Sequence, residues 1–153
     1  MDLKGKTAFV TGGSGDVGAA IANALARAGA DVAVSYVGHR DGAMATANAV
    51  DAVGVRSLVV QLDQRDPASI DASVDHVING LGRVDILVNN AGWNIGISFA
   101  ALDELTADIW DRVHETNLRG PLPAFPGIRA APSRARRRAD CEYCLGWRPA
   151  ASE

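Results

Sequence analysis

The fold is decided by residues 7–18, which read TAFVTGGSGDVG. Residues 7–11 form a short β-prone run, and residues 13–18 match the pattern G-x-G-x-x-G. Glycines at such positions permit positive φ angles and close approach of the backbone, and the following helix offers free N–H groups to a phosphate. The stretch therefore predicts a strand, a nucleotide-binding turn and a helix; a tight turn without a ligand is the alternative.

The alternation of strand and helix continues outward to residue 120. Apolar runs predict further strands at 31–36, 57–62 and 84–89, and apolar residues at helical spacing predict helices at 16–30, 41–53, 66–80 and 103–118. Continuous apolar strands indicate a sheet covered on both faces, and strand–helix alternation indicates parallel pairing. The predicted fold class is α/β, a doubly wound parallel sheet of about four strands.

Length and composition limit the remaining possibilities. The chain has 153 residues, which suits one domain, and 48% of them are hydrophobic, which suits a globular protein. No apolar run is as long as a membrane span, and the first residues lack the pattern of a signal peptide, so the expected compartment is the cytoplasm. A net charge of −3 argues against a nucleic acid as the main partner.

The charge is divided unevenly along the chain. Residues 1–120 hold nine basic and 15 acidic residues, whereas residues 121–153 hold six arginines and three acidic residues. The second segment also contains five of the six prolines and both cysteines. So abrupt a change marks a boundary near residue 120.

The end of the second predicted strand bears on the choice of dinucleotide. An acidic residue there normally binds the ribose 2′-hydroxyl of NAD. Residues 35–40 read SYVGHR and contain no acid. Arg40, helped by the neutral side chain of Ser35, can accept a 2′-phosphate instead, which favours NADP over NAD. The alternative is that Arg40 is a solvated loop charge.

Four motifs occur in the order found in one known family. They are TGxxGxxG at 11–18, Asp63 just after the third strand, NNAG at 89–92 and NLxG at 117–120. Together they resemble the short-chain dehydrogenase/reductase family, and the resemblance runs nearly without interruption from residue 3 to residue 120. It implies an NAD(P)-binding domain of Rossmann type, present only in part.

The resemblance also implies roles for individual residues. The cofactor-binding positions are Gly12, Ser14, Gly15 and Gly18 at the phosphates, Asp63 and Gln64 at the adenine amino group, and Asn90, Ala91 and Gly92 beside the nicotinamide ribose. Asn89 is expected to tie the fourth strand to the first near Thr11. Asn117 matches the asparagine of the family's Asn-Ser-Tyr-Lys tetrad, where it holds a water of the proton relay.

The chemistry implied by the resemblance is hydride transfer between a nicotinamide and a small carbonyl or alcohol substrate, in proteins that are usually homo-oligomers. In this family a tyrosine acts as general acid/base and a lysine in the pattern Y-x-x-x-K lowers its pKa. The only tyrosines are Tyr36 and Tyr143, and the only lysines are Lys4 and Lys6, so the pair is absent. The chain is therefore expected to be truncated and inactive alone. A non-catalytic dinucleotide-binding or interaction module is the alternative.

The segment 121–153 departs from the family, and a shifted reading frame explains the departure. Back-translated and read one base later, residues 139–146 allow Arg-Ile-Val-Asn-Ile-Ala-Ser, which resembles the family's fifth strand with its catalytic serine. The same shift over residues 123–129 allows Leu-Leu-Ser-Gln-Ala-Phe, which resembles the missing helix. A frameshift near Leu122 is the resulting hypothesis.

Other motifs have plainer interpretations. The pair Cys141 and Cys144 lacks a second pair of ligands, and the arginine run at 134–138 is typical of GC-rich codons read out of frame. His39, His76 and His114 have no metal-ligand spacing, so no metal is expected. Trp93 and Ser98 are candidates for the substrate pocket, and packing is an equal alternative for Trp93.

Overall fold

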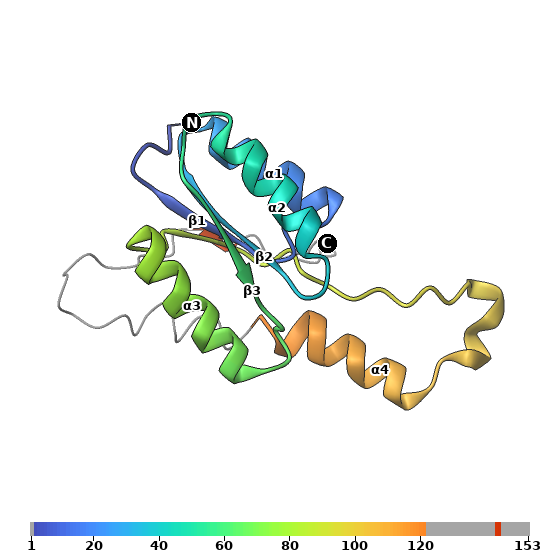
Figure 1. Cartoon of the computed structure of the whole chain (residues 1–153). Coiled ribbons are helices and arrows are strands. Elements are labelled where there is room, and N and C mark those ends of the chain that lie inside the picture. The colour runs from blue at the N-terminus through green and yellow to red at the C-terminus, as the bar shows by residue number, and fades with distance from the viewer. Residues whose placement is uncertain (1, 122–142, 145–153) are drawn as a thin grey trace, which may run out of the picture.

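A computed structural model describes residues 2–121 and 143–144 of the chain (Figure 1). The elements in order are β1 (Thr7–Val10), α1 (Asp16–Arg27), β2 (Asp31–Tyr36), α2 (Arg40–Asp51), β3 (Ser57–Gln61), α3 (Pro67–Leu81), β4 (Ile86–Val88), a 3₁₀ segment η1 (Phe99–Glu104), α4 (Ala107–His114), a π-helical segment η2 (Glu115–Arg119) and β5 (Tyr143–Cys144). No helix in these two ranges is long and apolar enough to cross a membrane.

The strands form one parallel sheet in the order β3-β2-β1-β4-β5. Since every strand runs the same way, the carboxyl ends of β1, β2, β3 and β4 meet at one edge, and the loops that follow them lie together there. In addition to the four expected strands, the two-residue β5 pairs with β4, opposing Tyr143 to Ile86 and Cys144 to Leu87.

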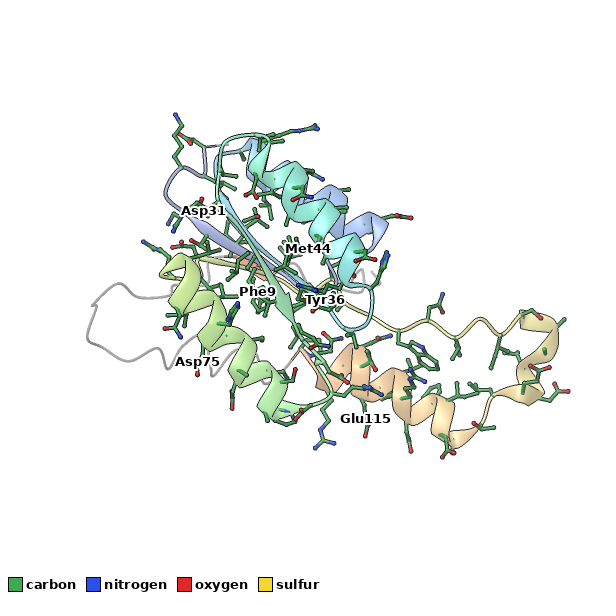
Figure 2. All side chains as sticks on the ribbon, in the orientation of Figure 1. Phe9, Asp31, Tyr36, Met44, Asp75 and Glu115 are labelled. Atoms are coloured by element: carbon green, nitrogen blue, oxygen red, sulfur yellow. The ribbon has the colours of Figure 1, made fainter. Side chains whose placement is uncertain are left out.

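Alternate residues of the strands enter two separate cores. Ala8 and Val10 of β1 pack with the cluster beneath α1 and α2, whereas Phe9 between them packs with the cluster beneath α3. Figure 2 places Phe9 between the sheet and α3. Both faces of the sheet are therefore covered, and the predicted α/β doubly wound arrangement is confirmed.

Local signals explain where the helices begin and end. The Asp66 side chain accepts a hydrogen bond from the Ala68 N–H (3.0 Å), and Pro67 occupies the first helical position of α3. Gly82 ends the same helix with a φ of 90°. These features agree with the predicted helix at 66–80.

The last helix differs from the single one predicted at 103–118. The Thr106 hydroxyl accepts a hydrogen bond from the Ile109 N–H (3.3 Å) and starts α4 four residues later than predicted. From Glu115 to Arg119 the helix continues as the π-helical η2, where the Thr116 carbonyl accepts a hydrogen bond from the Gln64 Nε2. No residue of α4 is buried, and the helix projects from the sheet (Figure 1).

Candidate functional site

The glycine loop joins β1 to α1 at the carboxyl edge of the sheet. Gly12 has a φ of +65°, and a Cβ on it would lie 2.9 Å from the Ala91 Cα, so only glycine fits there. The Gly12 N–H donates a hydrogen bond to the Ser35 Oγ (3.1 Å). Ser35 is buried and thus holds the loop from the end of β2.

Asn90 fastens the end of β4 to the glycine loop. Its amide Nδ2 donates hydrogen bonds to the carbonyls of Thr11 (2.9 Å) and Gly12 (3.2 Å), and its backbone N–H donates to the Thr11 Oγ1 (3.0 Å). The tie to β1 expected of Asn89 is therefore made by Asn90 instead. The Asn89 Oδ1 is buried without a hydrogen-bond partner among the described residues.

Two adjoining pockets lie on this edge, and Gly12, Val37, Ala91 and Gly92 line both. The first, called here the loop pocket, measures about 640 Å³ and is lined by Gly12, Ser14, Gly15, Asp16, Val17, Gly18, Val37, Gly38, His39, Asn90, Ala91 and Gly92. The second, called the side pocket, measures about 300 Å³ and is lined by Gly12, Ser35, Tyr36, Val37, Leu62, Asp63, Gln64, Arg65, Ala91, Gly92, Trp93, Arg112 and Thr116.

The loop pocket contains the N-terminus of α1. Gly15 caps this helix with backbone alone, and no side chain caps its free N–H groups. A Cβ on Gly15 would meet nothing closer than the Gly12 carbonyl at 3.8 Å, so neither sterics nor its φ of −99° requires glycine there. The positive end of the α1 dipole and the free N–H groups lie beside a glycine with open space around it, and together they suit a phosphate ester. The Asp16 carboxylate lies in the same pocket and opposes an anion.

The start of α2 closes the other side of the loop pocket. The Thr46 hydroxyl donates a hydrogen bond to the Gly13 carbonyl (2.9 Å) and joins α2 to the glycine loop. His39, the residue before α2, lines the loop pocket, whereas Arg40 is exposed and lines neither pocket. The sequence around His39 predicts only a loop residue. Its place after the second strand nevertheless puts it at the same sheet edge as the glycine loop.

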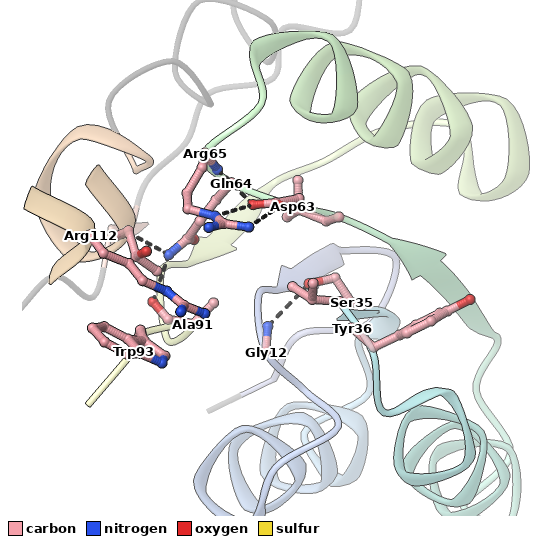
Figure 3. Close-up of a pocket in the computed structure, with 13 residues that line it drawn as sticks. Gly12, Ser35, Tyr36, Asp63, Gln64, Arg65, Ala91, Trp93 and Arg112 are labelled. Atoms are coloured by element: carbon pink, nitrogen blue, oxygen red, sulfur yellow. Dashed lines mark hydrogen bonds and ion pairs between the residues drawn. The ribbon is translucent and has the colours of Figure 1, made fainter. Parts of the chain in front are cut away.

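In the side pocket, Asp63 is paired with its neighbour Arg65. The carboxylate accepts hydrogen bonds from the Arg65 guanidinium at 2.7 and 3.1 Å, and its own N–H donates to the Ser69 Oγ. The Arg65 guanidinium lowers the pKa of Asp63 below its ordinary value, against the opposing effect of partial burial. Asp63 is thus an ionised acceptor at the pocket wall (Figure 3).

Gln64 and Asn117 hold the walls of the side pocket together. The Gln64 Nε2 donates hydrogen bonds to the carbonyls of Ala91 (3.0 Å) and Thr116 (2.6 Å). Asn117 accepts from the Trp93 N–H (2.7 Å) and donates to the Trp93 carbonyl (3.0 Å). Both amides thus join the segment after β4 to η2, a role that the sequence alone did not suggest.

Several predicted positions do come together. Gly12, Ser14, Gly15, Gly18, Asn90, Ala91 and Gly92 line the loop pocket, and Asp63 and Gln64 line the side pocket. No group of three or more potential metal ligands occurs in ranges 2–121 and 143–144. Cys141 and the arginine run at 134–138 lie outside the described residues.

Known proteins share this arrangement. The short chain dehydrogenase family model matches residues 6–128. An uncharacterized oxidoreductase of Methylorubrum extorquens is 40% identical over 122 residues, which cover 80% of this chain and 48% of that protein.

Two solved structures are similar as well. A blue fluorescent protein from a metagenomic library, in complex with NADPH, is 40% identical with a TM-score of 0.76, over 86% of this chain and 53% of that one. A short chain dehydrogenase of Burkholderia cenocepacia, in complex with NADP, is 41% identical with a TM-score of 0.76, over 84% and 51%. The chain therefore spans about half the length of the relatives it matches.

Proposed function

This chain belongs to the short chain dehydrogenase family, and we propose that it binds a nicotinamide dinucleotide across the loop pocket and the side pocket. The observation that carries this proposal is Gly15. Its missing side chain leaves room at an uncapped helix N-terminus, while the fold itself imposes no need for glycine there. A dinucleotide phosphate would use that room. In a reductase that has the Tyr-x-x-x-Lys pair, the reduced nicotinamide would give a hydride to a carbonyl, and the oxidised form would take one from an alcohol.

The preferred dinucleotide is NADP rather than NAD. Ser35 replaces an acid at the end of β2, and its hydroxyl accepts the hydrogen bond of the Gly12 N–H, so no carboxylate repels a 2′-phosphate at this place. Arg40 begins α2 next to His39 and is the proposed partner of that phosphate. The two structural relatives described above contain NADPH and NADP, which supports this preference.

The 153-residue chain is proposed to bind the cofactor without transferring hydride. It contains no Tyr-x-x-x-Lys pair to exchange a proton with a substrate oxygen. Asn117 is the only member of the family tetrad that the sequence matches, and its amide is committed to the Trp93 backbone. A carbonyl or alcohol substrate is therefore proposed only for a reductase that has the Tyr-x-x-x-Lys pair.

A shifted reading frame after Leu122 is proposed as the origin of residues 123–153. The structure pairs Tyr143 and Cys144 with Ile86 and Leu87. Read one base later, the codons of Tyr143 and Cys144 allow the Ile and Ala of the strand-like segment Arg-Ile-Val-Asn-Ile-Ala-Ser. A frameshift alters residue types but keeps the number of codons, so this pairing supports a fifth strand at the same place beside β4.

The alternative of an interaction module without catalysis is favoured by the surface of α4. Trp110 and Leu118 are more than half exposed on this helix and on η2. Where such side chains form one contiguous exposed patch, the patch marks a protein contact. Gel filtration of the pure chain, alone and with NADPH, measures whether it self-associates.

Calorimetric titration of NADPH into the full chain tests the proposal, with Gly15→Ala as the informative variant and Gly96→Ala as its control. A Cβ on Gly96 meets no atom within 4 Å, and Gly96 lines neither pocket. We expect Gly15→Ala to weaken NADPH binding at least tenfold while it lowers the free energy of unfolding by no more than about 1 kcal/mol, since alanine is a poorer N-cap than glycine. Gly96→Ala should bind NADPH as the parent does.

Two results would contradict the proposal. The first is absence of NADPH binding to the parent chain, and the second is equal affinity in the Gly15→Ala variant. A carbonyl-reduction assay on the same samples tests the absence of turnover, since steady oxidation of NADPH would show that the chain is an active reductase.

A further inference from the structure

The side pocket has an outer wall made of a stacked pair of side chains. The Arg112 Cζ lies 4.1 Å from the centroid of the Trp93 ring, and both residues line the pocket. Tyr36 and Leu62, from the ends of β2 and β3, line it as well. In Figure 3, Arg112 and Trp93 lie together on one side of the pocket, and Ser35 and Tyr36 lie on the other.

Hydrogen bonds near both residues hold the Trp93–Arg112 pair in place. The Asn117 amide accepts a hydrogen bond from the Trp93 N–H and donates one to the Trp93 carbonyl, and the Gln64 amide donates to the Thr116 carbonyl one turn after Arg112. Among the described residues Arg112 makes no ion pair. Its charged plane is thus supported by the indole and is not engaged by a carboxylate.

From this geometry we infer that Arg112 is a further cofactor-binding residue, which stacks on the purine base of the dinucleotide in the side pocket; the inference rests on the proposed function. A guanidinium plane and an aromatic ring both stack on nucleobases, with little preference among bases. A pocket of about 300 Å³ is at the lower limit for ligand sites, so it suits a base rather than a whole dinucleotide.

The polar groups of this pocket fit the same ligand. Asp63 offers ionised acceptor oxygens to a purine amino group, and Arg65 balances its charge. The loop pocket adjoins through Gly12, Val37, Ala91 and Gly92, so the phosphates of the same molecule reach the N-terminus of α1. A nicotinamide mononucleotide, which has no purine, would not contact Arg112.

The test compares Arg112→Ala, Arg112→Lys and the control Arg119→Ala in the full chain, with 5′-AMP, NADPH and nicotinamide mononucleotide as titrants. Arg119 is exposed on η2 and lines neither the loop pocket nor the side pocket. We expect Arg112→Ala to weaken the binding of 5′-AMP and NADPH five- to tenfold, and to leave that of nicotinamide mononucleotide unchanged. Arg119→Ala should bind all three as the parent chain does.

Arg112→Lys separates stacking from charge. Affinity for 5′-AMP close to that of Arg112→Ala supports stacking, and full affinity overturns it. Parent-like binding of 5′-AMP by Arg112→Ala, or an equal loss for all three titrants, also overturns the inference while the proposed function stands. A parent chain that binds neither NADPH nor 5′-AMP overturns both. Far-UV circular dichroism of each variant verifies that it is folded.

Discussion

Gly12, Gly15 and Gly18 occupy one loop, but each is glycine for a different physical reason. Gly12 needs its positive φ and its close approach to Ala91. Gly18 lies against Asn90, where a Cβ would be 2.7 Å from the amide nitrogen. Of the three, Gly15 alone is free of such constraints, and its side-chain space is the one that we propose for a ligand.

At the same scale, the ion pair of Asp63 makes a small pH-dependent contribution to stability. The folded-state pKa of Asp63 lies below the unfolded value of about 3.9, because Arg65 favours the carboxylate. The contribution is therefore present above that unfolded value and is lost as the pH falls through the lowered pKa. The Asp63 side chain is 33% exposed, so we expect Asp63→Asn to lower the free energy of unfolding by only about 0.5 kcal/mol at pH 7.

Urea unfolding of parent and variant between pH 7 and pH 2 measures this effect. The difference between the two proteins should shrink toward zero at the acidic end. Asp71→Asn, an exposed position on α3, serves as the control and should show no comparable trend. A difference for Asp63→Asn that grows on acidification would contradict the assigned direction of the pKa shift.

At the scale of the element, the placement of α1 depends on its contact with the end of β4. A Cβ on Gly18 would lie 2.7 Å from the Asn90 Nδ2 and 2.8 Å from the Gly13 Cα. It would therefore collide with the groups whose hydrogen bonds join the end of β4 to the glycine loop. We expect Gly18→Ala to lower the free energy of unfolding by about 1–3 kcal/mol through overpacking. In an unconstrained helix the same change would stabilise by about 1 kcal/mol. Thermal unfolding therefore distinguishes the two cases: an overpacked variant is less stable than the parent chain, and an unconstrained one is more stable.

The elements also show how much of the structure could be predicted from the sequence. Strand and helix positions in residues 7–81 followed from apolar periodicity and from local caps such as Asp66, because both signals act over a few residues. That Asn90 rather than Asn89 ties β4 to β1 could not be foreseen, since which of two adjacent side chains faces β1 depends on the twist at the strand end. The stacking of Arg112 on Trp93 likewise depends on a contact across 19 positions of sequence.

At the scale of the whole molecule, β4 is only partly paired on its outer side, and the projecting α4 has no buried residue. Only two residues of β5 pair with β4, and α4 buries none of its residues. An incompletely paired strand is a site of association between chains. In the neighbouring reading frame, the segment from residue 123 resembles a helix and the later segment from residue 139 resembles the fifth strand, and a complete fifth strand would pair with the outer side of β4.

The reading-frame proposal leads to a prediction for the complete protein. The nucleotide sequence beyond the Leu122 codon, read one base later, should encode a Tyr-x-x-x-Lys motif after the serine at the codon of Leu145. The protein made from that frame should oxidise NADPH with a carbonyl substrate, because the tyrosine then has a lysine to lower its pKa. The 153-residue chain should bind NADPH without oxidising it, and replacing the motif tyrosine by phenylalanine should abolish turnover but keep binding. A neighbouring frame that lacks the motif, or a frame-corrected protein that binds NADPH no differently and reduces no carbonyl, would show instead that residues 123–153 are the native sequence of a binding protein.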